Sequence, residues 1–244
     1  MSEAPAHRLD LGRRQRLGMI EAIWGEHKSA EQIARILEDT QAAGELALAT
    51  RVSEAKAEAV QRALAGSLTI EYHPQARCLT AGALPAVDTG RGRVAVLGGG
   101  TSDLPVAAEV RLALACHGIA TELVLDVGVA GLHRLLGQLE HLEQADVLIA
   151  CAGMEGALPT VLAGLLPQPV IGVPVSVGYG VSAGGEAALR GMLASCAPGL
   201  SVVNIDNGYG AAIAAVRILQ GQDSWPCDGP TVQTVRGAED PGSR

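Results

Sequence analysis

Aromatic residues are scarce in this chain, so ring packing contributes little to its interior. The sequence has 244 residues with no Phe, two Trp and three Tyr, whereas 48% of its residues are hydrophobic. The cores must therefore be built from Ala, Val, Leu and Ile. Such small and branched side chains suit helices that pack closely on a sheet.

The chain also lacks an excess of basic side chains, an even set of cysteines and long apolar runs. A formal net charge of −8 argues against a nucleic-acid ligand, which needs a basic surface. The five cysteines are odd in number and show no CxxC spacing, which argues against a disulfide framework or a zinc site. No signal-peptide pattern opens the chain, and no apolar run is long enough to span a membrane. We expect a cytoplasmic protein that handles small molecules.

The composition changes along the chain and divides it into parts. At this length two domains are expected. The predicted parts are an N-terminal arm (1–28), a small α/β domain (29–84), a turn-rich linker (85–92), a larger domain (93–220) and a largely disordered tail (221–244).

The small domain is predicted to mix helices and strands. Ser29 precedes a segment whose apolar residues share one helical face, which indicates a capped helix. The remaining elements expected here are strands over 45–50, 68–72 and 78–81 and a second helix over 53–64.

The larger domain is predicted to be a three-layer, doubly wound parallel sheet of the flavodoxin or Rossmann type. Its expected strands are mostly apolar and show no polar alternation, as is typical of strands covered on both faces. They lie at 93–97, 121–126, 146–150, 169–173 and 200–204. Ligands of such folds bind beyond the carboxyl ends of the strands. The loops that follow all five strands carry glycine beside polar residues, so we expect them to form the binding edge.

The first of these loops, Gly98-Gly-Gly-Thr-Ser-Asp103, looks suited to an anion. Its glycines leave backbone N–H groups accessible, and Ser102 or Asp103 could cap the helix that follows. The loop fits neither the dinucleotide fingerprint nor the P-loop, since glycine is missing at Asp103 and no Gly-Lys-Ser/Thr occurs.

Charged residues in the other loops are candidates for chemistry, although each has a structural interpretation too. Glu155 stands between two glycines after a strand, where it could face the crevice or stabilise a helix start. His133 and Arg134 could meet a phosphate or carboxylate, or begin a surface helix. Asp206 and Asn207 fit helix capping better than metal binding.

One cysteine is a candidate nucleophile. Cys196 lies in a loop that leads into the last strand, where a thiol would be reachable, whereas Cys116 and Cys151 fall on apolar segments and fit the core. No activating histidine lies beside Cys196 in sequence, so spacing alone does not decide its role.

The loops taken in order resemble the LarB family of nickel-pincer nucleotide cofactor synthesis. The motifs are GGGTSDLPVAAE, DVGVAGLHRLL, ADVLIACAGMEGALPTVLAGL, VIGVPVSVGYGVSAGGEAAL and SCAPGLSVVNIDNGYGAA. The segments 16–21, 25–28 and 49–51 resemble that family's leading part. The larger domain is also similar to aminoimidazole ribonucleotide carboxylases, although its second loop is longer and its third carries Met154 and Glu155.

The resemblance implies an enzyme, a carboxylase and phosphoanhydride hydrolase. Its expected substrates are nicotinic acid adenine dinucleotide, CO2 and water, and its products pyridinium-3,5-biscarboxylic acid mononucleotide and AMP. Cys196 would add to the pyridinium ring and Glu155 would act as a base near C5. The implied substrate-binding residues are Gly99, Gly100, Ser102, Asp103, Asp126, His133, Arg134, Gly153, Met154, Asp206 and Asn207.

The resemblance also implies Mg²⁺ at the pyrophosphate, with ligands that the sequence does not identify. Biotin and ATP are not implied, and a homo-oligomer is expected, an octamer being favoured. An aminoimidazole ribonucleotide carboxylase or mutase is the alternative enzyme, which would not need Cys196. A module that binds an adenylate without chemistry is the alternative outside enzymes.

Overall fold

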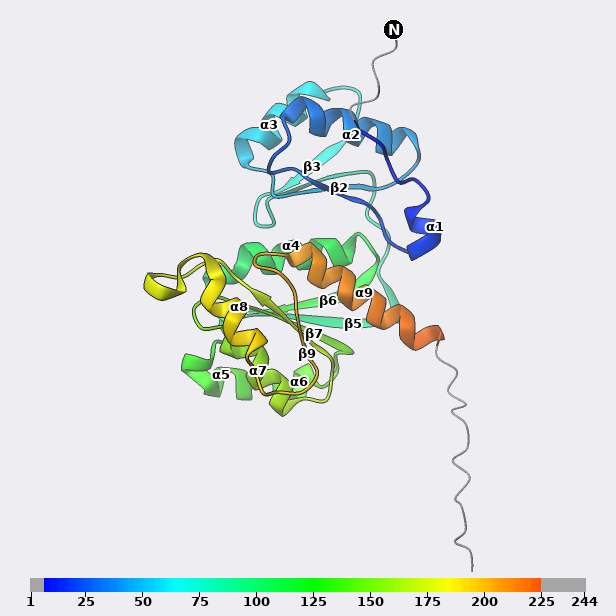
Figure 1. Cartoon of the computed structure of the whole chain (residues 1–244). Helices are drawn as coiled ribbons and strands as arrows, with labels where there is room; N and C mark the ends of the chain where they lie inside the picture. The colour runs from blue at the N-terminus through cyan, green and yellow to red at the C-terminus, as the bar shows by residue number, and fades with distance from the viewer. Residues whose placement is uncertain (1–6, 225–244) are drawn as a thin grey trace, which may run out of the picture.

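The computed structural model describes residues 7–224, which form two α/β domains stacked through a helical layer (Figure 1). In the described range no helix combines the length and apolar character needed to cross a membrane. Trp225 and Cys227, which the sequence places in a tail, lie outside the described residues.

The small domain is a four-stranded sheet with helices on its outer face (Figure 1). Its strand order is β1-β2-β4-β3; β1 and β2 run parallel and the other pairs antiparallel. Ser29 and Gln32 form a capping box at the start of α2, as the sequence indicates for Ser29. Its elements are α1 (Arg13–Leu17), β1 (Ala22–Trp24), α2 (Ala30–Ala42), β2 (Ala47–Thr50), α3 (Glu54–Ala63), β3 (Ile70–His73) and β4 (Cys78–Ala81).

The larger domain is a five-stranded sheet in which every neighbouring pair is parallel. Its strand order, β6-β5-β7-β8-β9, confirms the predicted doubly wound fold class. Its strands are β5 (Asp88–Gly98), β6 (Ile119–Val124), β7 (Val147–Ala152), β8 (Val170–Pro174) and β9 (Leu200–Val202). Its helices are η1 (Thr101–Asp103), α4 (Leu104–Ala115), η2 (Val129–Gly131), α5 (Leu132–Leu136), α6 (Leu139–Leu142), α7 (Ala157–Leu165), η3 (Gly180–Gly185), α8 (Glu186–Leu193) and α9 (Gly208–Ser224).

One apolar core joins the two domains. Leu48 and Cys78 of the small sheet pack in the same cluster as Val110 of α4 and Val216 of α9. Figure 1 shows α4 and α9 as the layer between the two sheets, and α5 to α8 on the far side of the larger one. The small domain therefore covers one face of the larger domain's helices rather than hanging from a linker.

Three predicted boundaries differ from the structure. The N-terminal arm contains β1, which pairs with β2, because Ile23 faces the core of the small domain. The turn-rich linker overlaps β5, which begins at Asp88 and shifts its register with β6 before Arg93. Helix α9 continues to Ser224, past the predicted end at Gln220.

Candidate active site

Because the five strands of the larger sheet run parallel, the loops that follow them meet at one edge. Four of these loops, after β5, β6, β7 and β8, line a cavity of about 460 Å³, which we call the loop cavity. Its wall includes the predicted site residues Gly99, Gly100, Ser102, Asp103, Gly153, Met154 and Glu155.

Glycines let these loops approach one another closely. A Cβ on Gly153 would lie 2.2 Å from the carbonyl oxygen of Val177, and one on Gly128 would lie 2.5 Å from that of Gly99. A Cβ on Gly100 would meet open space. Glycine at 128 and 153 therefore serves contact between loops, whereas position 100 has room for a side chain.

Asp103 is the N-cap residue of α4, as predicted, but its side chain makes no capping hydrogen bond there and fills the glycine loop from within. Its side chain is 5% exposed, and Oδ2 accepts the Gly100 N–H at 2.8 Å. At the start of α4 it makes no side-chain cap, and Gly99 donates its N–H to the Cys151 carbonyl. Burial raises the pKa of Asp103, opposed by backbone N–H groups of Gly100 and Gly99. Two of the N–H groups predicted to cradle a phosphate are thus engaged inside the protein.

Glu155 and Met154 lie at the mouth of the loop cavity, between β7 and α7. Glu155 is exposed and lines the cavity. Met154 has φ +52°, a left-handed conformation that is rare for a non-glycine residue and that clusters at functional sites. The structure therefore places Glu155 at the cavity. From the sequence alone, Glu155 could either face the crevice or stabilise a helix start.

Asp126, His133 and Arg134 lie beside the loop cavity rather than in its wall. Arg134 forms an ion pair with Asp126, Nη1 to Oδ2, so the carboxylate it meets belongs to its own chain. His133 is exposed on the short helix α5. A ligand in the cavity could reach these three side chains only with a part that extends beyond the cavity wall.

Cys196 is exposed, as expected, but does not line the loop cavity. It lies between α8 and β9, before the amino-terminal end of β9. The site lies at the other, carboxyl end of the strands. Its neighbour Ser195 accepts a hydrogen bond from Thr160 of α7 at 2.8 Å. Cys116 and Cys151 are buried, as the sequence indicates, and burial raises their thiol pKa values, that of Cys116 to about 12.

A second cavity of about 380 Å³, the inter-domain cavity, opens where the small domain meets the loop edge. Ser102 and Val177 line both cavities, which are therefore adjacent. Asp206 lines it, and its Oδ1 accepts the Ser176 N–H at 2.8 Å. Asn207 accepts the Gly210 N–H at 2.9 Å and caps α9, which matches its structural interpretation.

Residues that the sequence did not single out as site residues complete the inter-domain cavity. Arg51 donates to the Asp206 carbonyl at 2.7 Å, and Arg77 is the last residue of the turn between β3 and β4. Glu109 of α4 is 7% exposed, and its Oε1 accepts the Tyr209 N–H at 2.8 Å. Burial raises the pKa of Glu109, opposed by that hydrogen bond and by Arg51. Of these residues, only Arg51 lies in a motif that the sequence analysis noted. Arg77 and Glu109 gave no signal, because the residues that line the cavity with them are distant along the chain.

Residues 7–224 contain no group of three or more His, Cys, Asp or Glu side chains that could hold a metal ion. The residues present therefore do not form a protein cage for the Mg²⁺ that the resemblance implies.

Two family models match this chain, one over each domain. A LarB/PurE-like N-terminal domain matches residues 2–83, and AIR carboxylase matches residues 93–225. This chain belongs to the AIR carboxylase family and has the LarB domain architecture. Its function is carboxylase-related, and the family acts on small molecules.

Relatives match either most of the chain or about half of it. An uncharacterised protein of Methanocaldococcus jannaschii, MJ0165, is 36% identical over 85% of this chain and 82% of its own length. The N5-carboxyaminoimidazole ribonucleotide mutase of that organism is 36% identical over 53% of this chain and 80% of its own. A crystal structure of a variant of Treponema denticola PurE2 covers 52% of this chain and 79% of its own, with 24% identity and a TM-score of 0.45.

Proposed function

We propose that this protein carboxylates nicotinic acid adenine dinucleotide with CO2 and hydrolyses its phosphoanhydride. The products are pyridinium-3,5-biscarboxylic acid mononucleotide and AMP. The observation that carries the proposal is the pair of adjacent cavities joined at Ser102, since a dinucleotide has two nucleotide halves to accommodate. A mononucleotide such as an aminoimidazole ribonucleotide needs only one of them.

The loop cavity suits the pyridinium half. Its lining is largely backbone and apolar side chains, including Val129, Leu158 and Tyr179, against which a flat ring can pack. Glu155 supplies a carboxylate at the mouth. We assign Glu155 the removal of the C5 proton, which restores the aromatic ring after carbon has bonded to CO2.

A nucleophile is needed because an electron-poor pyridinium ring does not attack CO2. Addition of a thiolate forms a C–S bond and moves an electron pair to the ring nitrogen. The resulting enamine carbon then forms the bond to CO2. After the base takes the C5 proton, the electron pair expels the thiolate and the cysteine is regenerated.

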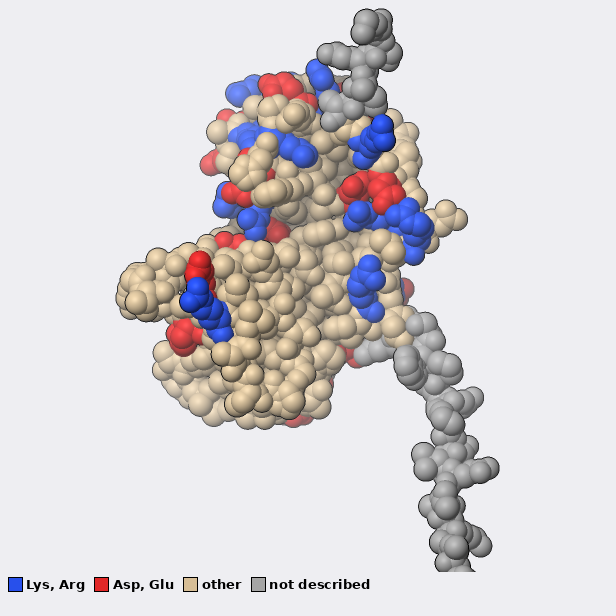
Figure 2. All heavy atoms as spheres, viewed as in Figure 1, with Lys and Arg blue, Asp and Glu red and all other residues tan. Residues whose placement is uncertain are grey.

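Cys196 is the thiol we assign to this step. Because of its position, it must reach the site of another copy of the chain. It is exposed and outside the loop cavity of its own chain. We propose that a second copy brings its Cys196 to the cavity mouth. Exposed apolar side chains support such an association, with Tyr179 78%, Val181 96% and Leu193 66% exposed. Figure 2 shows few charged side chains on the visible face of the larger domain.

The assay that tests the proposal supplies purified protein with nicotinic acid adenine dinucleotide and bicarbonate, with and without Mg²⁺. Liquid chromatography then separates AMP from the mononucleotide. We expect both products from the wild type and neither from Cys196→Ala. Conversion of an aminoimidazole ribonucleotide instead, undiminished in Cys196→Ala, would assign the chain to the purine reaction that its mutase relative's name describes. Binding of the dinucleotide without any product would favour a binding module.

A further inference from the structure

A third cavity lies in the small domain, away from the loop edge. Its volume of about 350 Å³ falls within the range of about 300–1,000 Å³ usual for small-molecule sites. The segment 7–14, which we call the strap, forms one wall, and β1 and α2 contribute to the others. We call this space the strap cavity. It shares no lining residue with the loop cavity or the inter-domain cavity, so the proposed reaction leaves it unused.

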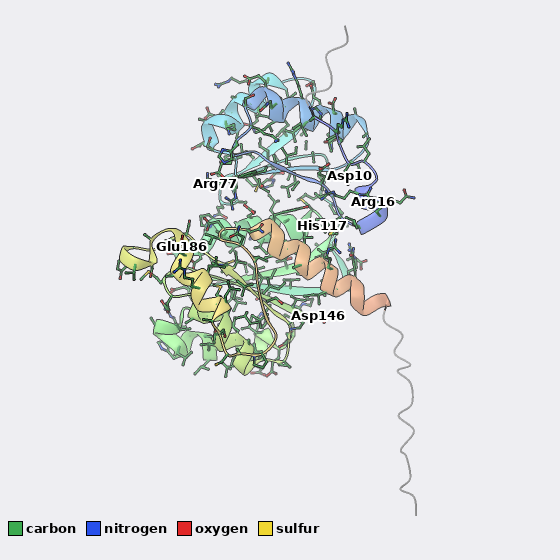
Figure 3. All side chains as sticks on the ribbon, viewed as in Figure 1. Asp10, Arg16, Arg77, His117, Asp146 and Glu186 are labelled. Atoms are coloured by element: carbon green, nitrogen blue, oxygen red, sulfur yellow. The ribbon has the colours of Figure 1, made fainter. Side chains whose placement is uncertain are left out.

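The strap is tied to the rest of the small domain near both of its ends. Nε2 of His7 lies 2.8 Å from Oδ2 of Asp39, and Nη1 of Arg14 lies 3.2 Å from Oε2 of Glu45. Figure 3 shows Asp10, in the middle of the strap, on the side of the small domain that carries α1. Because both ends are held, the strap is a fixed wall of the cavity.

The floor of the strap cavity is apolar and elongated. The lining residues follow α2 from Lys28, directly before Ser29 at its N-cap, to Thr40 in its last turn. Twelve residues of helix span about 18 Å, so the floor suits a linear apolar body. Five of its apolar side chains are at most 7% exposed: Met19, Ile20, Ile23, Ile36 and Leu46.

Polar side chains in the wall already have partners within the protein. The Thr40 hydroxyl donates to the Ile36 carbonyl at 2.7 Å, and Oε2 of Glu21 accepts the Asp10 N–H at 3.0 Å. A polar group in the body of an occupant would lose water without gaining a partner here, which costs free energy. The body of the occupant should therefore be hydrocarbon.

Two cations of the wall have no internal counter-charge. Among the residues that the structure describes, neither Lys28 nor Arg8 has a side-chain hydrogen bond or an ion pair. Lys28 is half-buried, whereas Arg8 is exposed. A half-buried ammonium beside apolar side chains favours a bound anion, which replaces the water that the charge has lost.

We propose that the strap cavity binds a linear alkyl carboxylate. Lys28 binds the carboxylate, and the alkyl chain packs on the apolar floor along α2. Arg8 adds positive charge to the wall. The site is independent of the proposed reaction, and its test requires no turnover.

Occupancy of this site would also act on the junction between the domains. Ile20 lies in the floor, and its backbone N–H and carbonyl are hydrogen-bonded by His117 and Tyr209 of the larger domain. An alkyl chain packed on Ile20 therefore favours the folded pair of domains. We expect octanoate to raise the melting temperature in proportion to its occupancy of the site.

Fluorescence titration of the full chain with octanoate tests the proposal, because Trp24 lines the cavity and is 53% exposed. Trp225→Phe leaves Trp24 as the only tryptophan and serves as the reference protein. We expect a saturable change in Trp24 emission and an affinity that rises about two- to fourfold per methylene from hexanoate to octanoate. Octanol, which has the chain without the charge, should bind at least about tenfold more weakly.

Substitutions in the reference protein test the role of Lys28. Lys28→Met keeps most of the side-chain length without the charge and should weaken octanoate binding about tenfold, whereas Lys28→Arg should stay within about threefold. Arg62→Met removes an exposed cation of α3 outside the cavity wall and should leave the affinity unchanged.

Equal octanoate affinity of Lys28→Met and the reference protein would overturn the proposal. Equal binding of octanol and octanoate would do the same, as would the absence of saturable octanoate binding by the reference protein. Thermal melting of each variant without ligand confirms that it is folded.

Discussion

At the scale of single residues, Asp103 shows how the site loop is held. Its buried carboxylate accepts the Gly100 N–H, and burial raises its pKa. The sequence correctly marks this loop as unusual but cannot tell whether its N–H groups face a ligand or a side chain of the loop itself. That distinction depends on the burial of one carboxylate, which is a property of the packed structure.

Replacing Asp103 should therefore affect stability before it affects chemistry. We expect Asp103→Ala to lower the free energy of unfolding by about 1–3 kcal/mol, because backbone N–H groups would lose their buried acceptor. Asp103→Asn keeps one acceptor oxygen and should lose less. Urea denaturation of the three proteins measures this, and equal stability of Asp103→Ala and the wild type would contradict the assigned role.

Glu155 is the residue whose change should stop turnover with little effect on folding, since its side chain is exposed. We expect Glu155→Gln to slow product formation about 10²–10⁴-fold, the range for loss of a general base. Addition of the thiol to the ring should persist, and intact-protein mass spectrometry would detect the adduct. Undiminished carboxylation in Glu155→Gln would remove Glu155 from the mechanism.

At the scale of elements, the sequence indicates the larger sheet well because its strands are apolar on both faces. The sequence does not indicate short elements at the edges of the domains. The three-residue strand β1 is recognisable only through its pairing with β2. For the same reason the inter-domain cavity could not be predicted, since Arg77 and Glu109 line one cavity only when the two domains pack together.

The loops after β7 and β8 depend on glycine at their contact. We expect Gly153→Ala to lower stability by about 1–3 kcal/mol and to reduce activity, because its Cβ would lie 2.2 Å from the Val177 oxygen. Gly164→Ala in α7 meets nothing within 4 Å and should raise stability by about 1 kcal/mol at most. Thermal melting and the product assay compare the two variants, and equal behaviour would refute the loop contact.

At the junction between the domains, the side chains of His117 and Tyr209 hold the backbone of Ile20 by hydrogen bonds, and we call this pair the Ile20 clamp. His117 accepts the Ile20 N–H at 3.3 Å through Nε2, while the Tyr209 hydroxyl donates to the Ile20 carbonyl at 2.9 Å. His117 is 5% exposed and lies between the domains in Figure 3. Burial lowers the pKa of His117 below its ordinary value of 6.5, with Arg91 and Arg14 acting in the same direction.

The lowered pKa gives a pH dependence with a definite sign. Between the native pKa and 6.5 the unfolded chain binds more protons at His117, so the free energy of unfolding falls as the pH falls below 6.5. The contribution is fully present above 6.5. We expect His117→Gln to lose less stability than the wild type between about pH 7.5 and 5.5, both measured by urea denaturation. His133→Gln, an exposed histidine, should behave as the wild type does. Parallel losses in all three proteins would contradict the clamp.

At the scale of the whole molecule, the site residues are split between the cavity edge and an exposed thiol. Glu155 lines the loop cavity and Cys196 does not. If a second copy supplies the thiol, inactive Glu155→Gln and Cys196→Ala chains should regain activity when refolded together, to about one quarter of the wild-type rate if two random chains pair. Activity that stays at the level of the separate variants would require both residues to act within one chain.

The most direct measurement is the mass spectrum of the nucleotides formed from nicotinic acid adenine dinucleotide in ¹³C-labelled bicarbonate. The proposed reaction requires AMP without label and a pyridinium mononucleotide that carries one ¹³C, both absent with Cys196→Ala. Unlabelled mononucleotide beside AMP would show hydrolysis without carboxylation. That result, or an unchanged dinucleotide, would contradict the proposed function.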